Sequence, residues 1–225
     1  MWGSAVPFLE RYEMTHTLHR RGKVDDLHED YVLLLRTSRF VNHEGSEEKM
    51  RQIWDVISHY EQDLVNFGNH KPSWAGGELY DMEALKKANS TIIHAVFKDR
   101  GKLKACLGEI KSRNFGISVV ISGLCEETQK ICSETGLSPH TVNYSLGIHG
   151  KAERLPEEEV LEINTMCGHA MVSFNLIRHM LKEIGKGKIT CRDAAKKLSR
   201  MCDCGVFNTY RAEKLLRKMT SVPTQ

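Results

Sequence analysis

The spacing of hydrophobic residues changes character near residue 150 of the chain. Before this point, short apolar runs that fit buried strands alternate with stretches whose apolar residues recur every three or four positions, as in amphipathic helices. After it, only the helical spacing remains. The first part therefore predicts an α/β layer, and the second part predicts a cluster of helices.

Strands are predicted at residues 30–40, 90–97, 116–123 and 140–148. The almost unbroken apolar letters ISVVIS in the third of these fit a strand that is covered on both faces. Because helical spacing separates the last three strands, we expect an α/β fold with a small sheet of three to four strands, mixed or parallel, and flanking helices.

Helices are predicted where apolar residues share one helical face and polar or acidic residues suit the first turn. They cover residues 46–67, 81–89, 100–114, 124–136, 165–184, 191–201 and 208–219, with a further helical first turn at 156–159. In the last third of the chain, Thr165, Thr190 and Asn208 are the expected capping residues.

These elements suggest three segments along the chain. Residues 1–75 hold an N-terminal arm, a strand and a helix, residues 76–150 hold the α/β sheet unit, and residues 151–225 hold the C-terminal helical cluster. A glycine- and proline-rich stretch at 68–81 is the expected joint between the first two segments. The densest basic cluster, at 18–23, is expected to be a solvated part of the arm.

The charge balance excludes several classes of protein. The chain has 32 Lys and Arg residues against 29 Asp and Glu residues, a net charge of +3, so it lacks the strong basic character typical of nucleic-acid binding. No apolar run approaches the roughly 18–20 residues of a membrane span, and the N-terminal residues do not form a secretory signal. We therefore expect a soluble cytoplasmic protein that binds neither nucleic acid nor membrane.

Seven cysteines set the question of function, at positions 106, 125, 132, 167, 191, 202 and 204. An odd number of cysteines in a chain of intracellular character argues against a disulfide framework. Each thiol is then a buried apolar group, a metal ligand or a nucleophile. Cysteines 106, 132 and 191 lie inside predicted helices, where packing is the expected role.

The strongest candidate site combines two short motifs, Cys167–Gly168–His169 and Cys202–Asp203–Cys204–Gly205. Cys167, His169, Cys202 and Cys204 supply four donors, the number that tetrahedral zinc or an iron–sulfur cluster requires. Both motifs lie at helix boundaries, and antiparallel helices of similar length would bring them to the same end of the cluster. The alternative for the first motif is a packed thiol beside a capping or core histidine.

Two further residues are candidate cofactor-binding groups. Cys125 follows the strand at 116–123, at the end where open α/β sheets place their ligands. His149 follows the strand at 140–148 and is flanked by two glycines that permit close backbone approach. The alternatives are a packed thiol at the start of a helix for Cys125 and a turn residue for His149.

An enzymatic alternative uses the same first motif. If Cys167 lies in the first turn of a helix, the helix dipole and free N–H groups lower its pKa, and His169 is a general base. The letters MCGHA resemble the Cys-Gly-His segment of proline racemase-type isomerases. This resemblance implies a cysteine that acts as acid and base on an amino-acid α-carbon, although the chain lacks the length and paired cysteines of that fold.

The sequence thus predicts a cytoplasmic metal-binding protein that holds zinc or an iron–sulfur cluster, with a redox or metalloenzyme role as an extension. The alternative is a cofactor-independent cysteine enzyme with Cys167 and His169 as catalytic residues and a small anionic substrate. A third interpretation is an interaction module in which every cysteine packs.

Overall fold

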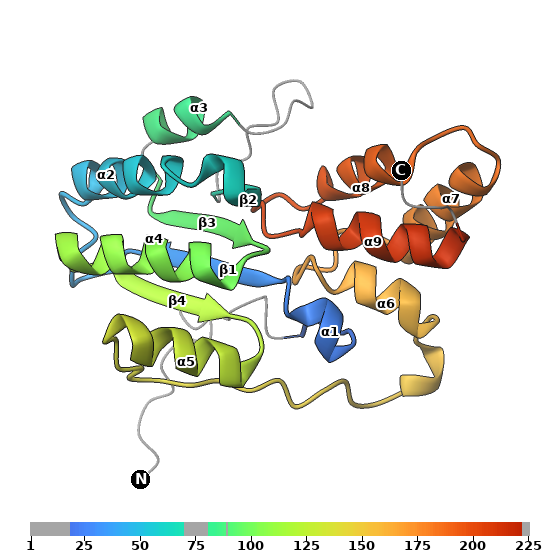
Figure 1. Cartoon of the computed structure of the whole chain (residues 1–225), viewed down its shortest axis with the longest axis horizontal. Helices are drawn as coiled ribbons and strands as arrows, with labels where there is room; N and C mark the ends of the chain where they lie inside the picture. Colours follow the sequence, from blue (N-terminus) through green and yellow to red (C-terminus); the bar gives the residue numbers. More distant parts are fainter. Residues whose placement is uncertain (1–18, 70–80, 89, 222–225) are drawn as a thin grey trace, which may run out of the picture.

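The structure is a computed structural model that describes residues 19–69, 81–88 and 90–221. Figure 1 shows a sheet with helices packed on it and a second group of helices, from the C-terminal part, beyond one end of the strands. The predicted arm up to residue 18 and residues 70–80 of the predicted joint lie outside the described residues. Every helix within the described ranges is too short or too polar to cross a membrane.

The sheet has four strands in the order β2-β3-β1-β4. The strands are β1 (Tyr31–Arg36), β2 (Leu64–Gly68), β3 (Ile92–Phe97) and β4 (Ser118–Ser122). All three neighbouring pairs are antiparallel. One helix follows β1 and another follows β3, so the sheet region has the split β-α-β order of ferredoxin-like topologies, a statement about topology that implies no function.

The predicted α/β class, the strand number and the C-terminal helices are confirmed, but the strands do not run mixed or parallel. Strands β3 and β4 do point the same way, as the helix between them suggests, yet β1 lies between them and is antiparallel to both. Hydrophobic spacing indicates that a strand is covered, but it does not identify the neighbouring strand. That neighbour is set by contacts between residues distant in sequence.

Two segments differ from their predicted structure. Residues 140–148 form neither helix nor strand, and the apolar side chains of Val142, Tyr144 and Leu146 are exposed despite their strand-like alternation. The helix predicted at 46–67 ends at Ser58. The last residues of the predicted range belong to strand β2 instead. In both segments the local pattern is compatible with two structures, and tertiary contacts decide between them.

Most helices begin near their predicted positions, but the helix predicted at 165–184 begins only at Phe174, and the helix at Val24–Leu27 was not predicted. Their bounds are α1 (Val24–Leu27), α2 (Glu47–Ser58), α3 (Met82–Lys87), α4 (Arg100–Arg113), α5 (Cys125–Thr135), α6 (Glu158–Asn164), α7 (Phe174–Gly185), α8 (Cys191–Ser199) and α9 (Thr209–Thr220), with short 3-10 turns at Glu61–Asp63 and Ala152–Arg154. The predicted caps Thr190 and Asn208 accept hydrogen bonds from Asp193 N and Arg211 N. Thr165 is not the N-cap that the sequence predicts, because it lies at the other end of a helix, as the C-cap of α6.

Two apolar cores lie on opposite faces of the sheet. The first core packs Leu33, Ile93 and their neighbours on one face against α2 and α4. The second core packs Val32 and Val96, from the other face, against α6 to α9. The sheet joins strands from residues 1–75 with strands from residues 76–150.

The C-terminal part is also tied to β2 by hydrogen bonds. The Asn66 amide donates to the carbonyl of Phe207 at 2.8 Å, and the Thr209 hydroxyl donates to the carbonyl of Val65 at 2.7 Å. The segment after α8 carries the second predicted cysteine motif. These contacts place it against β2, the outer strand of the sheet.

Candidate metal centre

Cys167 lies in a turn between α6 and α7 and not in the first turn of a helix. Its N–H donates to the carbonyl of Asn164 at 3.1 Å, and its own carbonyl accepts from the N–H of Ala170 at 2.9 Å. Ala170 has a φ of 55°, which interrupts the helical backbone, and Ser173 then caps α7 by accepting from Leu176 N. The predicted placement of Cys167 at a helix N-terminus is therefore wrong.

Cys202 and Cys204 lie in a tight turn after α8. The N–H of Gly205 donates to the carbonyl of Cys202 at 3.2 Å, and Gly205 has a φ of 74°. A Cβ atom on Gly205 would lie 2.2 Å from the carbonyl oxygen of Phe67, and one on Gly68 would lie 2.7 Å from the carbonyl oxygen of Cys204. The absence of both side chains lets the turn press its backbone against the end of β2.

The four predicted ligands contact one another in a chain, and we call them the thiol site. The Cys202 and Cys204 sulfurs are 3.9 Å apart, and the Cys204 sulfur is 3.8 Å from Nδ1 of His169. The Cys167 sulfur shares a hydrogen bond with Cys202. All three cysteines are at most 2% exposed, whereas His169 is exposed and lies on the outer side.

Two of the thiols, Cys167 and Cys202, resist ionisation as they stand. The hydrogen bond with Cys202, followed by burial, raises the pKa of Cys167 well above its ordinary value, although the N–H groups of Met171 and His169 act in the opposite direction. For Cys202, the hydrogen bond from Cys167 lowers the pKa, but Cys204 and burial outweigh it and raise the pKa to about 12. A bound cation reverses this preference, because thiolates are the form that ligates metals.

The side chains do not form a finished coordination sphere. Among the described residues, no group of three or more His, Cys, Asp and Glu side chains is arranged so that it could hold a metal ion. Binding would therefore require side-chain rotations that turn the sulfurs toward a common point. The side chains form a chain of contacting pairs, so these rotations would start from donor atoms that already lie within 4 Å of a neighbour.

The other two predicted site residues, Cys125 and His149, make no described contact with the thiol site. The Cys125 sulfur, at the start of α5, accepts a hydrogen bond from Gln129 at 3.3 Å and raises the pKa of the neighbouring Tyr144. His149 is exposed in the irregular segment before α6. Their predicted roles in cofactor binding stay predictions. Cys106 is fully buried in the first core, and Cys191 is buried in the second.

Comparison of the chain with protein-family models, with curated proteins and with solved structures finds no match. The function must therefore be argued from the chemistry of the site itself.

Sequence reasoning missed a buried ionic network beside the thiol site. Asp30 accepts hydrogen bonds from the guanidinium groups of Arg20 and Arg211 and from the Asn208 amide. Burial alone would raise the pKa of Asp30, but the two guanidinium groups outweigh it and hold the pKa below its ordinary value. Arg20 belongs to the basic cluster at 18–23, and its predicted solvation is wrong because its side chain is only 7% exposed.

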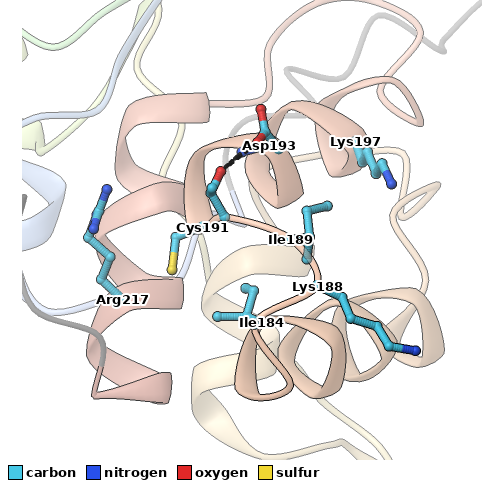
Figure 2. A pocket seen from close by; sticks show the side chains of 9 residues that line it. Ile184, Lys188, Ile189, Cys191, Asp193, Lys197 and Arg217 are labelled. Atoms are coloured by element: carbon cyan, nitrogen blue, oxygen red, sulfur yellow. Dashed lines mark hydrogen bonds between the residues drawn. The ribbon is translucent and has the colours of Figure 1, made fainter.

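A surface cavity of about 590 Å³ lies near the start of α8, away from the thiol site (Figure 2). It is lined by Ile184, Gly187, Lys188, Ile189, Thr190, Cys191, Asp193, Lys197 and Arg217. The Thr190 hydroxyl donates to the Asp193 carboxylate at 2.6 Å and accepts from the Asp193 N–H at 3.0 Å. The helix start is thus capped by its own side chains, and the cavity holds none of the predicted ligands.

Proposed function

We propose that this protein binds a metal centre, zinc or an iron–sulfur cluster, through Cys167, Cys202 and Cys204, with His169 as a further ligand. The observation that supports this proposal is the meeting of three buried thiols and one imidazole from two turns that are more than thirty residues apart. Soft sulfur donors together with imidazole are the ligand set of zinc and iron–sulfur sites.

The separations within the thiol site favour a single tetrahedral ion as the first candidate. Two sulfurs that each lie about 2.3 Å from tetrahedral zinc are about 3.8 Å apart, and a sulfur and an imidazole nitrogen are about 3.6 Å apart. The corresponding separations here are 3.9 Å for Cys202 and Cys204 and 3.8 Å for Cys204 and His169. In a four-iron cluster each cysteine binds a different iron, so its thiolates lie farther apart.

The surroundings of the sulfurs also suit a thiolate–metal site. N–H groups of His169 and Met171 donate to the Cys167 sulfur, and the N–H of Val206 donates to the Cys202 sulfur. Such outer hydrogen bonds orient metal ligands and stabilise the negative charge on sulfur. Three thiols that pack only as apolar groups would have no need of these donors.

The alternative of a cysteine enzyme has lost its physical basis. It relied on a helix N-terminus to lower the pKa of Cys167, but Cys167 follows the end of α6 and its pKa is raised. Its side chain is also buried, with 1% of the residue exposed, so a substrate has no direct approach to the sulfur.

The test is metal analysis of protein purified without oxygen, for the wild type and for two matched variants. Cys204→Ser removes one proposed ligand, whereas Cys106→Ser makes the same change at an equally buried thiol in the first core. We expect about one metal centre per wild-type chain, retention in Cys106→Ser and loss in Cys204→Ser. A colourless zinc protein and a brown iron–sulfur protein distinguish the two metals. A wild-type protein that holds neither metal, and takes up neither when supplied, overturns the proposal.

A further inference from the structure

Arg20 lies between the two turns that carry the thiols. One nitrogen of its guanidinium group, Nη2, donates to the carbonyl of Met166 at 3.3 Å and also to the carbonyl of Val206. Met166 directly precedes Cys167, and Val206 follows the Cys202–Gly205 turn. A single buried side chain therefore connects two segments that are far apart in sequence and that meet at the thiol site.

The contact with Val206 leads directly to a sulfur atom. The carbonyl of Val206 accepts from Arg20, while the N–H of the same residue donates to the Cys202 sulfur. On the other turn, the N–H of Arg21 donates to the hydroxyl of Thr165 at 3.0 Å. Arg20 thus contacts the backbone on both sides of the thiol site, whereas Arg21 contacts only a side chain two residues before Cys167.

A buried carboxylate holds Arg20 in this position. Asp30 pairs with Arg20 through one oxygen and with Arg211 through the other, at 3.0 Å for Arg211. The two arginine side chains are 7% and 1% exposed, and that of Asp30 is fully buried. The two guanidinium groups share this one carboxylate, and the buried Glu162 carboxyl interacts with Arg211 as well.

We infer that Arg20 is a positioning residue of the metal centre, which aligns the Cys167 turn with the Cys202–Cys204 turn so that their sulfurs can bind a common ion. This inference rests on the proposed function. The role requires arginine specifically, because the planar guanidinium group contacts Asp30 and two carbonyls at once, whereas the ammonium group of lysine is a single point charge. Outer-shell residues of this kind typically change metal affinity by roughly 10- to 100-fold.

Arg211 is the matched control. It pairs with the same Asp30 and is also buried, but its side chain donates otherwise to the carbonyl of Arg21 and interacts with the Glu162 carboxylate, while its backbone N–H donates to Asn208. None of these residues belongs to a cysteine turn. Arg20→Met and Arg211→Met therefore disturb the same ionic network, and only the first removes the contacts with Met166 and Val206.

The experiment is titration of the metal-free protein with Co²⁺ alone, read by the thiolate-to-cobalt absorption bands and by competition with a chelator. We expect Arg20→Met to weaken Co²⁺ affinity by roughly 10- to 100-fold, Arg211→Met to stay within about threefold of wild type, and Arg20→Lys to follow Arg20→Met. Circular dichroism identifies any variant that does not fold, and Arg20→Lys then replaces Arg20→Met in the comparison.

Two results overturn the inference while the proposed function stands. Equal losses of Co²⁺ affinity in the Arg20 and Arg211 variants would mean that the ionic network acts only on stability. Unchanged cobalt spectra and affinity in the Arg20 variants would mean that the two turns align without Arg20. A wild-type protein with no cobalt absorption overturns the proposed function itself, and the inference with it.

Discussion

The two cores of this protein differ in the kind of residue that they bury. The first core is almost wholly apolar and contains one isolated thiol, Cys106, among leucines, isoleucines and aromatic rings. The second core contains the three thiols of the thiol site, and the ionic network of Asp30 lies beside it. Apolar burial is sufficient to explain the first core. Buried charges cost free energy, so the second region indicates selection for something besides stability.

The largest expected effect comes from the ionic network. Asp30→Ala leaves two buried guanidinium groups without their carboxylate, and we expect it to lower the free energy of unfolding by about 3–5 kcal/mol. Urea denaturation measures the loss. The control is Glu29→Ala, whose ion pair with Lys214 is partly exposed and contributes at most about 1 kcal/mol. Equal effects of the two changes would remove the contrast between the regions.

The same carboxylate contributes to the loss of stability in acid. Its folded pKa lies below the ordinary value, so its contribution is present above an unfolded pKa of about 4 and is lost as the pH falls through the lower, folded value. The Asp30→Ala variant should accordingly show a weaker decline of stability below pH 4 than the wild type does.

The next effect concerns the isolated thiol of the first core. Burial, with a smaller contribution from Glu109, raises the pKa of Cys106 to about 12 from an ordinary 9.0. Its contribution is fully present below pH 9 and is lost as the pH rises toward 12, at about 1.4 kcal/mol per pH unit. Cys106→Ala should therefore lose less stability than wild type between pH 9 and 11 in urea denaturation. Parallel declines in the two proteins would contradict a neutral buried thiol.

The first core was the more predictable of the two. The spacing of Met50, Ile53, Trp54 and Ile57 along α2, and the apolar run of β3, are local signals that survive in the structure. Strand neighbours were not predictable in the same way, because β1 pairs with residues about sixty and ninety positions away. No local pattern encodes such pairing.

The residues of the candidate site could be predicted from the sequence, but the ionic network that supports them could not. Cys202, Cys204 and the Cys167 motif stand out by residue type and spacing, and the contacts bring them together as predicted. The predicted reason was wrong, because Cys167 lies between α6 and α7 and does not open a helix. Asp30 and Arg211 are 181 residues apart, and each resembles an ordinary surface charge in the sequence. Buried ion pairs of this kind become visible only when the fold brings the partners together.

The smallest expected effect tests a segment that belongs to neither core. Leu146 has the alternating apolar neighbours of a strand, yet it is 81% exposed and unpaired by any strand among the described residues. Leu146→Ser should change the free energy of unfolding by less than about 0.5 kcal/mol, as exposed positions generally do. Leu33→Ser, in the first core, is the control and should cost several kcal/mol because it removes buried apolar surface and buries a hydroxyl. A loss at Leu146 as large as that at Leu33 would mean that the segment packs as the strand its sequence predicts, and that the protein has a third region of buried apolar contact.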